Sequence, residues 1–373
     1  MDTPKLSIVI ATRNREYYCK RCIAVMLRYI SYDTQIVISD NSDSSDLLDF
    51  VNSSCDERIF YKHSDGALTM SENYNIALEC ASGEYICMIG DDDIILPAIF
   101  DVVDFAITNN IEAIGQREVI DYLWPSDFTT GHVRIPKYTN RVLKLDSHEI
   151  LIKYLRKGGC FNPRDAKLPM LYHGIVKRSL LQQIKNETGE ILTGISPDSY
   201  SACAIAQRIK THYIYDTPFT IAGACKTSAT SAKLMGGHCG ELKESAQYNM
   251  NVAKGYVWAK DVPEFYSVQT IWADSTLHNM CPEFLQYFRL KPLVARALMT
   301  NRHIAKTIIH YTNIHLDNKK KNNKTLFYLD VSMRICSLFI CRVVSKIFRT
   351  INKSDKRMDG IKHINDITSI LSD

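Results

Sequence analysis

Three consecutive aspartates, Asp91, Asp92 and Asp93, come directly after the apolar segment Glu84–Ile89 and Gly90. Adjacent carboxylates repel and raise one another's pKa, so such a run is unfavourable unless its charge is compensated. Mg²⁺ or Mn²⁺ would compensate it, because these ions bind one or two carboxylates together with phosphate oxygens. The ion would also stabilise the charge that grows on a departing diphosphate. The alternative is an acidic turn ahead of a helix at Pro97, favoured by the helix dipole.

Strands and helices alternate through the first hundred residues. Short apolar runs predict four buried strands, at Leu6–Ala11, Gln35–Ser39, Arg58–Lys62 and Glu84–Ile89. Thr69 and Glu72 have the spacing of a capping box, which predicts a helix from this point to Gly83. Another helix is expected over Ala98–Thr108, with Pro97 in its first turn. This alternation predicts an α/β fold with a mainly parallel sheet and helices on both faces.

Polar segments follow three of these strands. They are Thr12–Arg15, Asp40–Ser42 and Asp91–Asp93. In open parallel sheets, ligands bind beyond the carboxyl ends of the strands. We therefore expect the three segments to face a common site, and this coincidence favours the metal interpretation of the aspartates.

These segments resemble a family 2 glycosyltransferase of the GT-A fold, a nucleotide-diphospho-sugar transferase fold. The resemblance is carried by LSIVIATRNR at Leu6–Arg15, by IVISDNSD at Ile36–Asp43, and by the segment from Met70 through ASGEYICMIGDDDIILP to Pro97. It is firm over residues 4–110, weaker to about residue 225, and absent beyond.

The resemblance implies a role for each matching position. Asp93 would ligate the metal directly, and Asp91 would face the ribose or the metal. Asp40 would read the base, and Asn73 would approach the nucleotide from a neighbouring helix. The remaining residues implied to bind the nucleotide-sugar are Thr12, Arg13, Arg15 and Asp92. Taken singly, Arg15 could be a solvated side chain, Asp40 a turn residue and Asn73 a helix-surface residue.

An inverting transferase also needs a base to accept the proton of the acceptor hydroxyl. Such enzymes place an acidic residue, often Glu-Asp, before a late helix, and the matching residue here is Asp198. Pro197 stands where an acid is usual, which weakens the match. Alternatively, Ser196 caps the helix and Asp198 only complements its dipole.

Two further side chains have open assignments. His238 lies in the Ser-, Thr- and Gly-rich segment Thr227–Gly240, a place from which some relatives supply a late metal or phosphate ligand. A solvent-exposed histidine is the alternative. Trp124 is expected either to stack on a sugar ring or to pack in the core.

The implied activity is metal-dependent, inverting transfer of one sugar, of the hexosyltransferase-like class EC 2.4. The donor would be a nucleotide-sugar, a UDP-sugar by preference. The acceptor would be a glycan, free or polyprenyl-linked, in bacterial surface polysaccharide biosynthesis such as lipopolysaccharide O-antigen or capsule. The alternatives are a sugar-nucleotide nucleotidyltransferase, disfavoured because Ala11–Arg15 lacks glycine, and a non-catalytic carbohydrate-binding or scaffold protein.

Residues 1–235 are expected to form the catalytic domain, with a nucleotide-binding half, 1–110, and an acceptor half, 111–235. Residues 236–318 should be a mostly helical extension. Residues 319–373 should form a basic amphipathic tail that either lies in a membrane interface or docks on the catalytic domain. Its helical pattern carries charge too often for a spanning helix.

Composition narrows the function further. A net charge of +4 over 373 residues is small, which argues against a nucleic-acid binder. The twelve cysteines have no disulfide-like spacing, which suits a reducing compartment. The Cys19–Cys22 pair falls in an apolar helical pattern and is expected to be core rather than a zinc site. The sequence indicates the cytoplasm, with peripheral contact to the inner face of the plasma membrane as an option.

Overall fold

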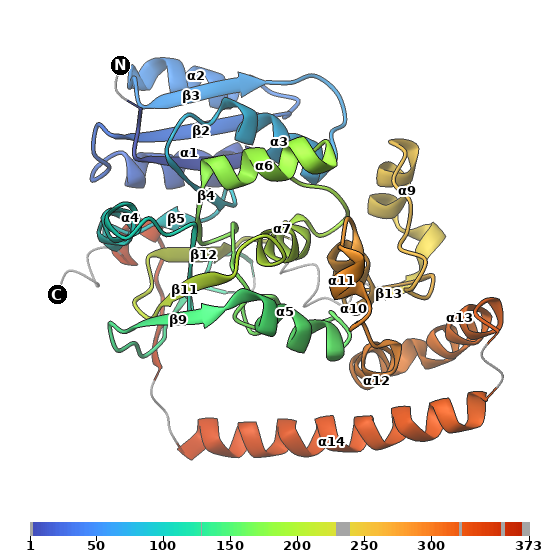
Figure 1. The fold of residues 1–373 in the computed structure, drawn as a ribbon. Helices are drawn as coiled ribbons and strands as arrows, with labels where there is room; N and C mark the ends of the chain where they lie inside the picture. The colour runs from blue at the N-terminus through green and yellow to red at the C-terminus, as the bar shows by residue number, and fades with distance from the viewer. Residues whose placement is uncertain (1–2, 128, 229–238, 321–322, 352–354, 368–373) are drawn as a thin grey trace.

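A mixed sheet of eight strands forms the centre of the molecule (Figure 1). The computed structural model describes residues 3–127, 129–228, 239–320, 323–351 and 355–367. The strand order is β3-β2-β1-β4-β10-β6-β11-β9. Its first four strands are parallel, and β10 and β9 run against their neighbours. The predicted α/β class, with a mostly parallel central sheet, is confirmed.

The parallel half contains the four predicted strands. Their bounds are β1 Leu6–Thr12, β2 Thr34–Asp40, β3 Ile59–His63 and β4 Tyr85–Ile89. The register pairs Thr12 with Asp40, so the polar residues that end β1 and β2 lie at the same edge of the sheet. The acidic run follows the end of β4 at this edge.

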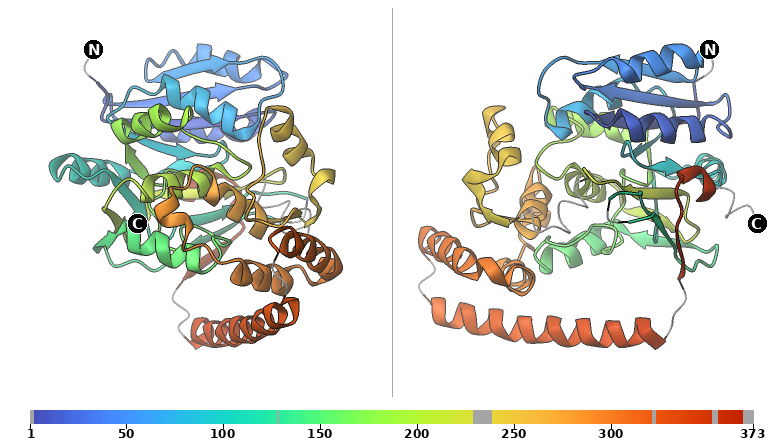
Figure 2. Two further views of the ribbon diagram at one scale, coloured as in Figure 1. Left: turned by 45° about the vertical axis from the view of Figure 1, so that its right-hand side comes forward. Right: turned by 180° about the vertical axis from the view of Figure 1, so that it is seen from behind.

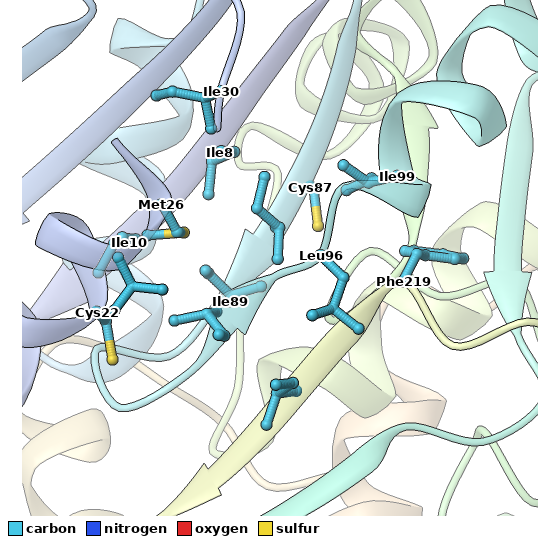
Figure 3. Packing of buried hydrophobic residues seen from close by; sticks show 14 of the residues in the cluster. Ile8, Ile10, Cys22, Met26, Ile30, Cys87, Ile89, Leu96, Ile99 and Phe219 are labelled. Carbon is cyan, nitrogen blue, oxygen red and sulfur yellow. The ribbon is translucent and has the colours of Figure 1, made fainter. Parts of the chain in front are cut away.

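Helices cover both faces of this half. They are α1 Glu16–Met26, α2 Asp46–Ser54, α3 Met70–Cys80 and α4 Ala98–Thr108. The capping box of Thr69 and Glu72 is present at the start of α3. Cys19 and Cys22 are fully buried on α1, and Figure 3 shows Cys22 packed with Met26 and Ile10. The expected core role of this cysteine pair is confirmed.

The chain from β5 to β12 completes the large sheet and supplies most strands of a smaller one. The elements are β5 Ile94–Ile95, β6 Ala113–Gln116, β7 Ile120–Leu123, β8 His132–Ile135, β9 Val142–Asp146, α5 Ser147–Arg156, β10 Ile175–Lys177, α6 Arg178–Thr188, α7 Pro197–Ala206, β11 Thr211–Tyr215 and β12 Thr220–Ala224. A smaller sheet has the order β15-β8-β7-β12-β5. Because β12 lies beside β5, it brings the chain near residue 223 back to the acidic run.

The region after residue 238 is mostly helical, as expected. It comprises β13 Cys239–Glu241, η1 Leu242–Glu244, α9 Ala246–Ala253, β14 Phe265–Ser267, α10 Val268–Leu277, α11 Pro282–Leu285, α12 Leu290–Thr300, η2 Arg302–Ile304, α13 Ala305–Asn318 and α14 Lys324–Ile351. Figures 1 and 2 show α9 to α13 at one side of the sheets, with α14 running beneath the molecule from that side to the other. Within the described ranges, no helix is both long enough and apolar enough to cross a membrane.

The chain after α14 returns to the smaller sheet. Strand β15, Lys356–Asp359, pairs with β8 in the smaller sheet, and the buried Ile364 and Ile367 join the main hydrophobic core. A side chain at Gly131 would collide with the carbonyl oxygen of Ile361, 1.9 Å from the Cβ position. The domain division stays a prediction, but the segment expected as a tail contributes a strand to the smaller sheet and residues to the hydrophobic core.

Candidate active site

Asp91 and Asp92 share one cationic partner, Arg15. The Arg15 guanidinium lies 3.0 Å from Asp91 Oδ1 and 2.7 Å from Asp92 Oδ2. Thr12 Oγ1 donates to Asp91 Oδ2 at 2.7 Å, and the Cys225 backbone N–H donates to Asp92 Oδ2 at 3.0 Å. Residues after β1, β4 and β12 therefore converge on one buried cluster, as the strand-end argument predicts for the first two.

Burial dominates the ionisation of this pair. It raises the pKa of Asp91 to about 7 and that of Asp92 to about 6, although Arg15 acts in the opposite direction on both. Repulsion from Asp92 and Asp93 also raises the pKa of Asp91, and repulsion from Asp93 raises that of Asp92. Burial alone would lower the pKa of Arg15, but the two carboxylates outweigh it and raise that pKa. The cluster is thus short of positive charge.

Asp93 has a different environment, in which protein donors occupy both oxygens. Oδ1 accepts from the Gly223 N–H at 2.6 Å, and Oδ2 accepts from the Gly90 N–H at 2.6 Å and the Tyr172 hydroxyl at 2.8 Å. His173 Nε2 lies 3.2 Å from Oδ2. Burial acts to raise the pKa of Asp93, but His173 and the two N–H groups outweigh it and the pKa is lowered. Asp93 joins the end of β4 to β12 and to the segment before β10.

Gly223 can approach Asp93 this closely only because it lacks a side chain. A Cβ atom at this position would lie 1.9 Å from the carbonyl oxygen of Asp92. The same carbonyl accepts a hydrogen bond from Trp124 Nε1 at 3.1 Å. Trp124 is only 3% exposed and belongs to the hydrophobic core next to the acidic run. Of the two expected placements, the structure shows the one in the core.

Asp40 and Asn73 brace the neighbouring strand ends. Asp40 accepts from the Ser42 N–H and from the Tyr61 hydroxyl, both at 2.8 Å. Asn73 Nδ2 donates to the Thr12 carbonyl at 3.1 Å and to Asn41 Oδ1 at 2.9 Å. Both side chains are buried. They lie where the resemblance expects them, and base or nucleotide contact stays a prediction.

The fit to a divalent ion differs among the acidic residues. Asp91 and Asp92 hold the Arg15 guanidinium between them, and a divalent ion that bound the same oxygens would have to displace it. Ligation by Asp93 stays a prediction, and it requires Tyr172 and His173 to release Oδ2. Across the described residues, no three His, Cys, Asp or Glu side chains are grouped as a metal site. His238 lies outside the described residues.

Asp198 is the second residue of α7, whereas the resemblance placed it before the helix. It is partly exposed and follows Pro197, the first residue of the helix. Its Oδ1 accepts from the Ser196 hydroxyl and, at 2.9 Å, from the Ser199 N–H. The loop before it is fixed by α3 and α10, because Ser71 Oγ donates to the Gly194 carbonyl and the Ser196 N–H donates to Ser275 Oγ.

Arg164 is a functional candidate that sequence reasoning missed. Its Nε atom is buried and, within the part of the chain that the structure describes, has no hydrogen-bond partner. Burial lowers the pKa of its guanidinium, while the charges of Asp93 and Asp198 act in the opposite direction. Tyr172 and Asp121 act in that direction more strongly, so Arg164 is a buried guanidinium on which several acidic groups act.

Tyr172, His173 and Cys225 were missed as well. These residues lie outside residues 4–110, where the resemblance is firm. They are far from the aspartates along the chain and contact them only in the folded protein. Arg13 and Arg15, placed together by the sequence, differ in the structure: Arg13 is exposed while Arg15 contacts Asp91 and Asp92. The positive φ of 53° at Asn14 turns the chain between them.

A cavity of about 320 Å³ lies beside Trp124. Tyr17 and Arg21 of α1 line it together with Lys362 and His363 from the returning chain end. The Arg21 guanidinium lies 3.5 Å from the centre of the Tyr17 ring. The cavity therefore combines aromatic surface with cationic groups, a composition suited to an anionic glycan.

Residues 7–156, which contain the acidic run and its supporting strands, match the protein family described as glycosyl transferase family 2. This region of the chain is similar to that family. The matched region includes Thr12, Arg15, Asp40, Asn73 and Asp91–Asp93, and it ends before Asp198.

One similar curated protein is a GalNAc(5)-diNAcBac-PP-undecaprenol beta-1,3-glucosyltransferase of Campylobacter jejuni subsp. jejuni serotype O:2. It is 30% identical over 96 residues, which cover 25% of this chain and 31% of that protein. The aligned segment thus spans about a third of the curated relative.

Two solved structures are similar at lower levels. S. aureus TarS 1–349 in complex with UDP-GlcNAc has a TM-score of 0.47 and 13% identity, and the match covers 85% of this chain and 92% of that one. A mannosyltransferase from Pyrobaculum calidifontis, in complex with GDP-Man and Mn²⁺, has a TM-score of 0.39 and 12% identity, with coverages of 90% and 88%.

Proposed function

We propose that this chain transfers one sugar from a nucleotide-sugar donor to a glycan acceptor with inversion at the transferred carbon. The observation that carries the proposal is the convergence of Thr12, Arg15, Asp91 and Asp92 at the carboxyl edge of a family 2 glycosyltransferase region. Ligands of parallel sheets bind at this edge. The donor proposed is a UDP-sugar, with Asp40 and Asn73 beside the nucleoside.

A divalent ion, Mn²⁺ or Mg²⁺, is proposed to bind at the acidic run. Asp91 and Asp92 would hold it, with Asp93 and His238 as further predicted ligands. When bound, such an ion supplies positive charge to the diphosphate that leaves. The chain's own contribution is to place the carboxylates: Thr12 orients Asp91, and the Cys225 N–H orients Asp92.

Asp198 is proposed to accept the proton of the acceptor hydroxyl. A general base must reach that hydroxyl within hydrogen-bond distance, and its partly exposed position at the start of α7 permits this. The Ser196 hydroxyl and the Ser199 N–H orient one of its oxygens. The other oxygen is then available to the acceptor.

The acceptor is proposed to be a polyprenyl-diphosphate-linked glycan of a bacterial surface polysaccharide, such as O-antigen or capsule. Support comes from the Campylobacter jejuni relative, whose name specifies an undecaprenol-linked acceptor. The cavity lined by Tyr17, Arg21 and Lys362 adds chemistry suited to an anionic glycan. The cytoplasmic location predicted from the cysteines agrees with where nucleotide-sugars are made.

Arg164 is proposed to bind the diphosphate of the donor. Arg164→Gln is expected to weaken binding of the nucleoside diphosphate by roughly 10- to 100-fold, the usual effect of losing a hydrogen bond to a charged group. Calorimetric titration with UDP measures this. Arg156→Gln is the matched control, because the Arg156 guanidinium lies 5.1 Å from the centre of the Tyr287 ring, away from the aspartates. Equal UDP affinity in both variants would remove Arg164 from the site.

A donor screen tests the activity itself. UDP-, GDP- and CMP-sugars are offered to the protein with and without Mn²⁺, and thermal shift and donor hydrolysis are measured. We expect one UDP-sugar to raise the melting temperature by several degrees, more with Mn²⁺ than without. Hydrolysis of that donor should stop when the metal is chelated.

Other outcomes of the screen favour other functions. Binding without hydrolysis of any donor would support a carbohydrate-binding or scaffold protein. Release of pyrophosphate from a nucleoside triphosphate and a sugar phosphate would support a nucleotidyltransferase.

A further inference from the structure

One side of helix α14 carries a row of apolar side chains, the inner row, that packs against the rest of the protein. Phe327 and Val331 are buried, and they pack with Ile335 and Leu338 in the core cluster that contains residues of α12 and α13. The row recurs every three or four residues, so it occupies one side of the helix. Figures 1 and 2 show α14 as a long helix on the outer side of α12 and α13.

The opposite side of α14 carries a second apolar row, which we call the outer row. Its members are three, four or seven residues apart, which keeps them on one side of the helix, and each is between 44% and 61% exposed. They are Leu326, Leu329, Met333, Ile340, Val344 and Ile347. Phe339 and Val343, 54% and 42% exposed, widen the row in the second half of the helix. An exposed apolar face of this length marks an interaction surface.

The charges of α14 are strongly biased. The helix contains five Lys and Arg residues and one acidic residue, Asp330. Asp330 is neutralised by Lys291 and Arg334, at 2.8 Å and 2.5 Å. Arg342 is exposed on the second half of the helix. Two lysines at the start of the helix add less, because Lys319, just before α14, and Lys324, its first residue, pair with aspartates.

We propose that the outer row of α14 inserts into the surface of an anionic lipid bilayer. The helix would lie flat, with the inner row on the protein and the outer row among the acyl chains. A helix of 28 residues at 1.5 Å per residue presents a contact about 42 Å long. Apolar insertion and attraction of basic side chains to acidic headgroups then act together.

A second copy of the chain fits the same surface less well. Two α14 helices packed along their outer rows would bring together two helices with five basic residues and one acidic residue each. The same charge is attracted to an anionic bilayer. The exposed Phe339 and Val343 also make the apolar face wider than the narrow seam of a helix pair.

Both ends of α14 are fixed, which decides how the proposal is tested. The first half of α14 packs on α12. After the helix, the chain forms β15, which pairs with β8 in the smaller sheet. Deleting the chain from Lys319 would therefore remove a strand and core residues. Substitutions confined to the outer row leave these contacts in place.

The test is co-sedimentation of the full chain with vesicles of phosphatidylcholine alone or mixed with phosphatidylglycerol. The variant is Leu329→Gln/Met333→Gln/Ile340→Gln, and the control changes three exposed apolar residues elsewhere: Tyr32→Gln/Val252→Gln/Val257→Gln. We expect the intact chain and the control to bind the mixed vesicles, and the outer-row variant to bind at least tenfold less. Salt should weaken the binding of the intact chain in part.

Three results would overturn the proposal. The intact chain does not bind either type of vesicle, or the outer-row variant binds vesicles as well as the intact chain does. In the third, light scattering shows that the intact chain and the control are dimers and that the outer-row variant is a monomer. Equal melting curves for the variants exclude misfolding. Donor hydrolysis without vesicles is measured in parallel. Failure of membrane binding thus leaves hydrolysis intact, and failure of the proposed enzymatic function leaves vesicle binding intact.

Discussion

Asp93→Ala is expected to lower the free energy of unfolding by about 3–5 kcal/mol and to abolish sugar transfer. The substitution removes a buried carboxylate whose two oxygens both accept hydrogen bonds, and it leaves the buried donors without an acceptor. The Gly90 and Gly223 N–H groups and the Tyr172 hydroxyl would lose their acceptor. Urea unfolding measures the loss of stability.

The pH dependence of this loss follows from the lowered pKa of Asp93. A carboxyl group whose pKa is depressed in the folded state stabilises the protein above its unfolded pKa, which is about 3.9. That contribution disappears as the pH falls through the folded pKa. The deficit of Asp93→Ala should therefore be constant between about pH 5 and 8 and should shrink only below about pH 4.

Asp92→Ala is the matched control, and it should separate stability from activity. Burial raises the pKa of Asp92 to about 6, so its ionisation disfavours the folded state as the pH rises from about 4 to 6. Removing it also relieves repulsion, and Arg15 keeps its contact with Asp91. We expect stability at pH 8 to change by less than about 1 kcal/mol, while Mn²⁺-dependent donor binding is lost. Equal destabilisation by the two substitutions would contradict the distinct roles of Asp92 and Asp93.

Asp198→Asn is expected to lower the turnover number by roughly 10²-fold or more, in line with the loss of a general base. The Michaelis constant for the donor should change little, because the base acts on the acceptor. Steady-state kinetics with an accepted glycan measures both constants. Asn keeps the size of the side chain and can still accept from Ser196.

A helix-dipole role for Asp198 predicts another pattern. Asp101 lies in the first turn of α4, so Asp101→Asn removes a comparable charge from a comparable position. If Asp198 only complements the dipole, both variants should lose about 0.3–1 kcal/mol of stability and keep normal turnover per folded molecule. That result would exclude the general-base assignment.

The nucleotide-binding half of the fold could be predicted from local patterns. Continuous apolar runs identified β1 to β4 to within about a residue at each end, and the Thr69 capping box marked the start of α3. Strand ends then placed Thr12 and the acidic run at one edge, and their contact is observed. These inferences need only spacing along the chain and the geometry of parallel sheets.

The partners of the acidic run could not be predicted in the same way. Gly223 and Cys225 lie 130 and 133 residues from the aspartates that they contact. No local pattern reports such a contact, because it depends on how β12 is inserted beside β5. The three aspartates are identical in sequence, but tertiary structure gives them different partners. Asp91 and Asp92 contact Arg15, whereas Asp93 accepts hydrogen bonds from Gly223 and Tyr172. Arg164 was overlooked for the opposite reason, since its interest lies in the lack of a partner for its Nε in the described structure.

The pairing of β8 with β15 also has a consequence for synthesis of the protein on the ribosome. His132 in β8 and Asp359 in β15 are 227 residues apart along the chain. At a typical elongation rate of about 5–20 residues per second, β8 emerges roughly 10 to 45 seconds before its partner. Until then β8 is an open sheet edge, able to pair with other nascent chains. The smaller sheet therefore closes at β8 only after nearly the whole chain has been made.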